Sequence, residues 1–338
     1  MDIYLVFNEL SAIDGCSHPD ATLYTARQWM SDLGDVITAA RRQGILALKT
    51  YNDFFETELA SDYTIRDWLR DPEVDRELQR RIRSSGLAYP TLKPPFHSEA
   101  LGHLPEDIQQ AEGRALAFTF RDGQNREASG LGSAYLLESI AVSLNCHSYW
   151  EESEISLIIE HLDEETAEIY EETTTIRHAS QMAHVDIHRD WSQERFTTSV
   201  SDGRYLLSKC ESWYPDLIFI DAVRSQIETM NLGTPQLRQA IKKLFELQNY
   251  CIEWKEGGFD KDMLPSKASP ESASVRKDKR LSAMRIFTMP NGDEAYCEWH
   301  LRLTPDAWRL HFYPDTSTRK IVVCYIGKKF PTSKYRTI

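Results

Sequence analysis

The sequence has no long hydrophobic run. None of its apolar stretches approaches the roughly 20 residues needed to cross a bilayer, so we expect no membrane-spanning helix and no membrane partner. At the N-terminus, Asp2 is followed directly by the apolar stretch Ile3 to Phe7, without the basic and apolar regions of a signal peptide. We therefore expect a cytoplasmic protein.

Closely spaced cysteines are also missing. The six cysteines are scattered along the 338 residues, at Cys16, Cys146, Cys210, Cys251, Cys297 and Cys324. Zinc ribbons and disulfide frameworks use cysteines at short, repeated spacings. The pattern therefore predicts neither of these, and it favours reduced thiols.

Motifs for common cofactors and for nucleophilic catalysis are not evident. The run Ser129 to Ser133 could hold a phosphate on backbone N–H groups, but it lacks the Rossmann glycines and a Walker lysine. Small residues packing a helix on a sheet explain the run better. His184 and His188 would share a helical face, but no nearby glutamate completes a zinc motif, so with His178 they are interpreted as surface histidines. We expect no metal and no cofactor.

Basic residues are scarce in most of the chain and gather near its end. The net charge is −13, from 39 Lys and Arg against 52 Asp and Glu. From Lys261 onward the count is 15 basic against 8 acidic residues, a net of +7, so residues 1–260 carry a net of −20. This asymmetry indicates either a basic working surface with an acidic remainder, or two parts that neutralise each other in the fold.

Residues 1–205 are predicted to form an acidic α/β region. Apolar periodicity predicts strands at 3–7, 115–120 and 155–159, and helices at 20–44, 72–86 and 128–144. The proline-rich stretch Tyr89 to Pro105 is predicted to be a loop. Ten acids without a Lys or Arg lie between Glu151 and Glu172, which favours a solvated, partly disordered surface.

Residues 206–338 are predicted to form a second domain, which makes the fold class α+β. Its expected strands are 217–220, 285–288, 294–303, 308–313 and 321–326, and its expected helices are 222–230 and 236–254. Residues 255–280 are predicted to be a charged linker. Asn291-Gly292 is a strong hairpin signal between the second and third of these strands.

Strand alternation sorts the closing residues into two faces. Trp299, Leu301 and Leu303 would share one face with Trp308, Leu310 and Phe312, which leaves the intervening polar residues on the other. Pairing the two strands across residues 304–307 then brings two histidines and two arginines together, namely His300, Arg302, Arg309 and His311. Arg and Lys clusters suit phosphate contacts, and we expect RNA contacts from His311, Lys328 and Lys334 as well.

The order of these residues resembles a known family. An aromatic–basic–apolar–basic strand (Trp299 to Arg302) precedes an aromatic–Arg strand at Trp308-Arg309, an apolar strand, Gly327-Lys328-Lys329, and Tyr335 six residues beyond Lys329. This pattern resembles the RelE-type toxins, which are small ribosome-dependent messenger RNA ribonucleases. The likeness covers about forty residues well, residues 213–338 loosely, and none of residues 1–205.

The resemblance implies roles for individual residues. Arg309 and Lys329 would grip the scissile phosphate and stabilise its developing charge. His300 and Arg302 stand where the family keeps basic residues, and Tyr335 stands where it keeps a tyrosine that helps activate the 2′-hydroxyl. His300 replaces a lysine of the family pattern, Lys329 replaces an arginine, and Pro331 interrupts the stretch before the tyrosine.

The leading hypothesis is a bacterial toxin-like protein that binds RNA, either free or bound to the ribosome, or that cleaves it without a metal to leave a cyclic phosphate. The N-terminal region would restrain it or bind a partner such as an ATPase or an antitoxin, in the setting of phage defence. The alternative is a non-catalytic subunit of a defence complex that docks a partner through the same sheet. A third reading is a metal-dependent PD-(D/E)xK-like nuclease built from Asp216, Glu253 and Lys255, although these last two are expected to end a helix.

Overall fold

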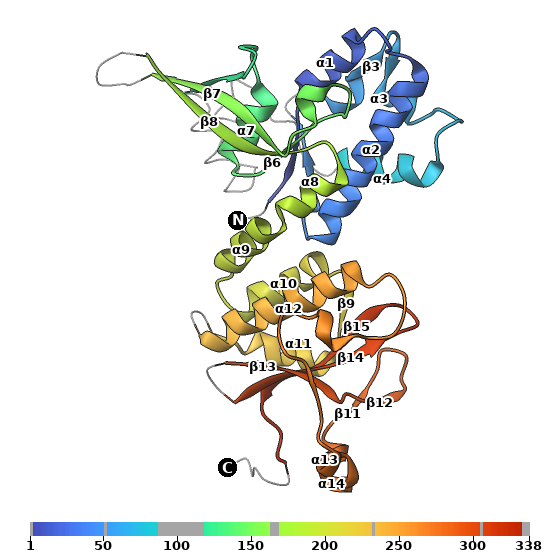
Figure 1. The fold of residues 1–338 in the computed structure, drawn as a ribbon, viewed down its shortest axis with the longest axis vertical. Helices are drawn as coiled ribbons and strands as arrows, with labels where there is room; N and C mark the ends of the chain where they lie inside the picture. The colour runs from blue at the N-terminus through green and yellow to red at the C-terminus, as the bar shows by residue number, and fades with distance from the viewer. Residues whose placement is uncertain are drawn as a thin grey trace. The chain divides into compact units, whose positions relative to one another are not determined.

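The computed structural model describes residues 3–50, 53–86, 118–162, 169–231, 234–304 and 307–332. The chain forms two compact units, Met1–Ser192 and Gln193–Ile338, and both contain helices and strands, as the α+β class requires (Figure 1). The expected boundary near 205 lies inside a helix of the second unit. The observed boundary follows Ser192, because the ring of Phe196 packs 4.8 Å from that of Trp213 and 6.2 Å from that of Phe245, in the core of the second unit.

The first unit is built on a six-stranded sheet in the order β2-β1-β6-β8-β7-β5. Its strands are β1 (Leu5–Phe7), β2 (Leu48–Lys49), β5 (Phe118–Asp122), β6 (Ile140–Val142), β7 (Glu154–Leu162) and β8 (Ile169–Ala179). Strands β2, β1, β6 and β8 run parallel, whereas β7 pairs antiparallel with both β8 and β5. A small hairpin, β3 (Glu58–Ala60) with β4 (Tyr63–Thr64), lies beside helix α1.

Several helices of the first unit begin at side-chain caps that the sequence only partly revealed. They are α1 (Glu9–Ser17), α2 (Leu23–Arg42), α3 (Ile65–Trp68), α4 (Arg76–Gly86), α7 (Ser129–Leu136), α8 (Met182–Ile187) and α9 (Arg189–Ser199), which continues into the second unit. Thr22, rather than the expected Asp20, caps α2 through a capping box with Thr25. Helix α4 starts after Pro72, where the Asp75 side chain accepts from the backbone N–H of Leu78.

One sequence expectation for this unit is wrong and another is right only in part. The helix predicted at 128–144 ends at Leu136, because Glu138 adopts a left-handed φ of 46° and the chain turns into strand β6. The acidic segment, expected to be a solvated, partly disordered surface, contains β7, which confirms the predicted strand 155–159. Ile155, Leu157 and Ile159 are buried, whereas Glu154 is exposed and Glu160 is half-buried. The predicted loop 89–105 lies outside the described residues.

The three histidines expected on the surface are buried, which corrects that interpretation. His178, His184 and His188 are 0%, 8% and 4% exposed. His178 bonds the carbonyl of Glu152 at 2.5 Å through Nδ1 and the Ser143 hydroxyl at 2.7 Å through Nε2. These bonds explain why the polar rings tolerate the core.

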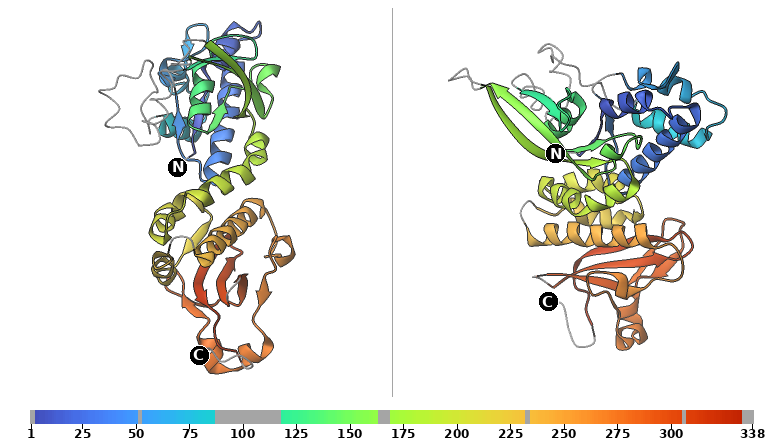
Figure 2. Two further views of the ribbon diagram at one scale, coloured as in Figure 1. Left: turned by 90° about the vertical axis from the view of Figure 1, so that its left-hand side faces the viewer. Right: turned by 45° about the horizontal axis from the view of Figure 1, so that its top comes forward.

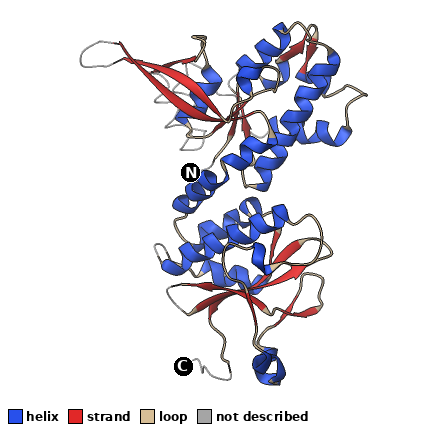
Figure 3. Ribbon diagram, in the orientation of Figure 1, coloured by secondary structure: helices blue, strands red, loops and turns tan. Residues whose placement is uncertain are grey.

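The second unit places helices on a five-stranded sheet in the order β10-β13-β14-β15-β9 (Figure 3). The strands of this sheet are β9 (Leu217–Phe219), β10 (Ser269–Pro270), β13 (Trp299–Leu303), β14 (Trp308–Asp315) and β15 (Lys320–Lys328). A separate two-stranded sheet consists of β11 (Ile286–Thr288) and β12 (Glu294–Tyr296). The helices of the second unit are α10 (Gly203–Trp213), α11 (Asp221–Glu228), α12 (Pro235–Glu253), α13 (Ala273–Lys277) and α14 (Lys279–Ala283). Helix α12 runs along the sheet (Figure 2, right).

Several expectations for the second unit are confirmed. The predicted helix 236–254 is α12, which Thr234 caps, and the Asn291-Gly292 hairpin joins β11 to β12 with Gly292 at φ 88°. The expected linker 255–280 is wrong in part, since it contains β10 and α13, and β10 pairs with β13. Within the described residues, no helix is long and apolar enough to cross a membrane.

Cys297 and Cys324 form a disulfide, which corrects the expectation of six reduced thiols. They are 27 residues apart in sequence, so spacing did not link them. They meet because Cys297 lies just before β13, and β15 has an extra residue, Cys324, where the register with β14 shifts between His311 and Phe312. The bridge lies in an apolar cluster with Met289 and Val322.

Acid should destabilise the first unit through His178. Burial lowers the pKa of His178 to about 4 from 6.5, so between these values the unfolded chain binds a proton that the folded unit does not. The free energy of unfolding should therefore fall as the pH drops through this window, by on the order of 3 kcal/mol. Urea denaturation at about pH 7 and about pH 5 crosses part of this window and should show a fall of about 2 kcal/mol, and His178→Gln should reduce the slope. His147→Gln, at an exposed position, should leave it unchanged, and an equally steep slope in His178→Gln would contradict the assignment.

Removing the disulfide should destabilise the second unit. A bridge across 27 residues restricts the unfolded chain, and its loss should cost about 3 kcal/mol. Cys297→Ala with Cys324→Ala should lower the denaturation midpoint, as should reductant on the wild type. Cys16→Ala, at a free cysteine, is the control, and an unchanged midpoint in the double variant would count against the bridge.

Candidate functional site

The polar face of the closing strands is assembled as the alternation predicted. In the β13–β14 ladder His300 lies opposite His311, and Arg302 lies opposite Arg309. The intervening apolar residues face α12, and Phe312 also packs 5.5 Å from the ring of Phe259. The strong apolar preference of that face fixes the register, because a slip of one residue would bury the arginines.

The two arginines form a like-charge pair. Arg302 is exposed and Arg309 is half-buried. The pKa of Arg309 is lowered by burial and then by the charge of Arg302. Nη1 of Arg309 donates to the carbonyl of Trp308 at 2.7 Å, whereas its buried Nε has no hydrogen-bond partner among the described residues. Like charges directly opposite in a sheet are destabilising, so a bound anion would relieve this pair.

The end of β15 brings one of the two expected lysines to this face. Gly327 lies opposite Arg309, and the backbone N–H of Lys329 donates to the carbonyl of Ala307 at 2.6 Å. By strand alternation Lys329 shares the face of Arg309, whereas Lys328, opposite Trp308, lies on the other face. Lys334 and Tyr335 lie outside the described residues.

His311 is buried rather than outward, which corrects its expected place on an open surface. It is 1% exposed and is covered by the rings of His300, Phe330 and Tyr325, at centroid distances of 5.1, 5.2 and 5.9 Å. Burial, and then the neighbouring His300, lower the pKa of His311 to about 3. The ring is therefore neutral near pH 7.

His300 is the half-buried histidine between this core and the arginines. Burial lowers its pKa, Glu271 raises it, and Arg309 lowers it again. Its Nδ1 is buried and has no hydrogen-bond partner among the described residues. A neutral imidazole beside a cationic pair can accept a proton.

A buried ion pair that the sequence did not reveal supports the histidines. Arg285 and Glu271, 1% and 7% exposed, are joined by a bond of 2.7 Å from Nε to Oε1. Arg285 also donates to the carbonyls of Leu281 at 2.8 Å and Pro331 at 3.1 Å. No motif marks this pair, because its members lie in the expected linker and before a hairpin.

The PD-(D/E)xK reading gains no geometric support. Glu253 ends helix α12, as expected from the sequence, and so does not lie on a strand. Asp216 is engaged by Gln248, whose Nε2 donates to Oδ2 at 3.0 Å while its Oε1 accepts from the Asp216 backbone at 3.0 Å.

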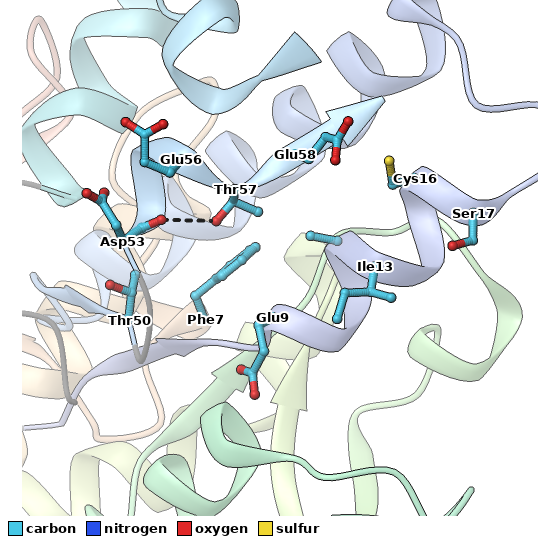
Figure 4. Close-up of a pocket in the computed structure, with 11 residues that line it drawn as sticks. Phe7, Glu9, Ile13, Cys16, Ser17, Thr50, Asp53, Glu56, Thr57 and Glu58 are labelled. Atoms are coloured by element: carbon cyan, nitrogen blue, oxygen red, sulfur yellow. Dashed lines mark hydrogen bonds between the residues drawn. The ribbon is translucent and has the colours of Figure 1, made fainter. Parts of the chain in front are cut away.

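The first unit holds a cavity of about 460 Å³ beyond the end of β1 (Figure 4). Its lining includes Glu9, Asp53, Glu56 and Glu58, so it repels phosphate. Both carboxylate oxygens of Glu9 accept from the backbone N–H of Gly130 at 3.0 Å. The run at 129–133 that could have held a phosphate is thus already bound to this chain's own carboxylate, and burial raises the pKa of Glu9.

Breaking the buried pair should strongly destabilise the second unit. Arg285→Met leaves Glu271 buried without its counter-charge and should cost about 3 to 5 kcal/mol. Arg276→Ala, which breaks a more exposed ion pair with Glu298, should cost less than about 1 kcal/mol. Chemical denaturation measures both. Arg285→Met with Glu271→Met should recover part of the loss, and a double variant as unstable as the sum of the singles would show that the two charges are not coupled.

The comparisons with known proteins leave the function to be argued from these residues. Neither family models, curated proteins nor solved structures gave a match to the chain.

Proposed function

We propose that this protein binds RNA through the polar face of β13, β14 and β15 and cleaves it without a metal, in the manner of the RelE-type toxins that the segment resembles. The observation that carries the proposal is the Arg302–Arg309 pair next to neutral His300. Two guanidinium groups that form no ion pair with another described residue suit the non-bridging oxygens of a phosphate, and His300 suits proton transfer beside it.

In the proposed reaction the 2′-oxygen attacks the adjacent phosphorus and the bond from phosphorus to the 5′-oxygen breaks. His300 takes the 2′-proton, and the leaving 5′-oxygen receives a proton from water, so the products are a 2′,3′-cyclic phosphate and a 5′-hydroxyl. Arg302, Arg309 and Lys329 stabilise the charge that develops on the phosphate oxygens. Tyr335 retains the role implied by the resemblance, assisting activation of the 2′-hydroxyl.

Two further features support the RelE-like interpretation. Helices lie on a small, mainly antiparallel sheet, as the resemblance implies. Lys329 lies on the same face as Arg309, although a lysine lacks the bidentate fork of arginine. His311 packs against His300 rather than contacting RNA, because it is buried.

The acidic remainder of the chain has a proposed part in regulation. Residues 1–260 carry a net charge of −20, and the cavity of the first unit is lined by carboxylates. Such a surface does not attract RNA. It suits restraint of the basic face or binding of a protein partner, such as an ATPase or an antitoxin in a phage-defence system.

A second candidate is a non-catalytic subunit that docks a partner through the same face. The like-charge arginine pair favours it equally if the bound anion is a carboxylate of an acidic protein. The two candidates predict different effects of the same variant.

Arg309→Ala combined with Lys329→Ala should abolish RNA cleavage by the full-length protein. Removing one preorganised charge contact typically costs about 100-fold or more in rate. The measurement is cleavage of labelled RNA with EDTA present, with detection of the cyclic phosphate. Lys277→Ala, an exposed lysine on α13, is the matched control and should cleave normally. Absence of cleavage by the wild type, together with loss of a co-purifying protein in the double variant, would favour the docking subunit.

A further inference from the structure

We propose that Glu271, His300 and His311 form a binding site for a divalent transition metal ion of the Zn²⁺ class. One ligand atom from each of these side chains lies within 4.8 Å of the other two. The ligands come from three segments: the residue after β10, strand β13 and strand β14. Two imidazoles with a carboxylate are a donor set used by zinc sites that keep an open fourth position.

His311 is oriented as a metal ligand would be. Its Nδ1 lies 3.3 Å from the carbonyl of Cys297, and donation to that oxygen leaves the lone pair on Nε2. Histidine ligands commonly donate their other ring N–H to a carbonyl or carboxylate, which fixes the tautomer. The disulfide to Cys324 holds Cys297 in place.

His300 supplies an unsatisfied buried nitrogen. Its Nδ1 has no hydrogen-bond partner among the described residues, and its ring centroid lies 5.1 Å from that of His311 across the ladder. Leaving a buried polar atom without a partner costs free energy. A metal ion bound to this nitrogen would remove that cost.

Glu271 is held in place by Arg285. The Arg285 Nε donates to Oε1 at 2.7 Å, and a carboxylate has a second oxygen with which to ligate. Metal-bound carboxylates are generally hydrogen-bonded in this way. The bond from Arg285 thus orients the Glu271 carboxylate as a ligand of the site.

The surrounding charges select the kind of metal. The positive charges of Arg285 and Arg309 oppose a dication, so a hard ion held mainly by electrostatics binds poorly here. Zn²⁺ forms strong bonds to imidazole nitrogen, whereas Mg²⁺ and Ca²⁺ prefer oxygen ligands. The site therefore takes Zn²⁺, or Co²⁺ as a probe, and not Mg²⁺.

Metal binding has a consequence for cleavage. A metal on His300 occupies the lone pair that the proposed proton transfer needs, so Zn²⁺ should slow RNA cleavage. This consequence alone rests on the proposed function; the binding site does not.

The test uses full-length protein treated with a chelator and then dialysed. Titration calorimetry with ZnCl₂ should give one equivalent bound, Co²⁺ should give the visible bands of tetrahedral coordination, and MgCl₂ should give no binding. His300→Gln should weaken Zn²⁺ binding at least about tenfold. His300→Cys should keep binding and add a thiolate-to-cobalt charge-transfer band, and His147→Gln, at an exposed position outside the cluster, should bind as the wild type does.

The proposal is overturned if the wild type shows no saturable Zn²⁺ binding, or if His300→Gln binds Zn²⁺ as tightly as the wild type. Thermal melts establish that each variant is folded, and His300→Cys carries the test if His300→Gln is not. Zn²⁺ binding by a wild-type protein that cleaves no RNA would sustain the metal site and refute the proposed cleavage. Cleavage without Zn²⁺ binding would do the reverse.

Discussion

The buried pair between Arg285 and Glu271 is the interaction on which the polar face depends. The guanidinium reaches carbonyls of α14 and of the segment after β15 while it bonds Glu271 beside β10. It also lies 5.2 Å from the ring centroid of Phe330. One charge therefore ties together three segments that are distant in sequence, and any loss of its partner leaves that charge without compensation in the core.

This pair determines what the histidines can do. The Arg285 guanidinium packs on the ring of Phe330, which covers His311 together with the rings of His300 and Tyr325. His311 is therefore buried and neutral, while His300 stays half-buried. The arginines that remain outside repel each other, since Arg302 and Arg309 occupy directly opposite positions. The arginine pair suits a bound anion, and the neutral histidines suit a metal ion that prefers nitrogen ligands. Both proposed uses need His300, so they compete.

The sequence predicted the parts of the site that alternation controls. Strands β13 and β14 have the expected faces and register, because apolar residues at every second position leave one arrangement that buries them all. Helix α12 followed from its period and its cap. The resemblance to RelE-type toxins is carried by the same residues and remains a proposal.

Other predictions failed where burial depends on neighbours distant in the chain. The strand at 155–159 was predicted, but the acids around it suggested a solvated surface, whereas β7 pairs with β8 on one side and β5 on the other and buries Ile155, Leu157 and Ile159. The histidines at 178, 184 and 188 were predicted to be solvated, but they are buried. In the core, His178 bonds a carbonyl and a hydroxyl, and His188 bonds a carbonyl. The bulge that brings Cys324 to Cys297 leaves no trace in cysteine spacing.

The features of the closing strands are therefore of two kinds, those that the sequence determined and those that only the tertiary structure decided. By itself the sequence determined which side chains share a face and that the chain ends in a basic segment, because strand period and charge are local properties. Only the tertiary structure decided that Glu271 lies beside His300 and His311 and pairs with Arg285, and that His311 is covered, because such contacts join residues that have no spacing in common. The candidate metal site draws on both kinds, because alternation brought His300 and His311 together and only the tertiary structure added Glu271.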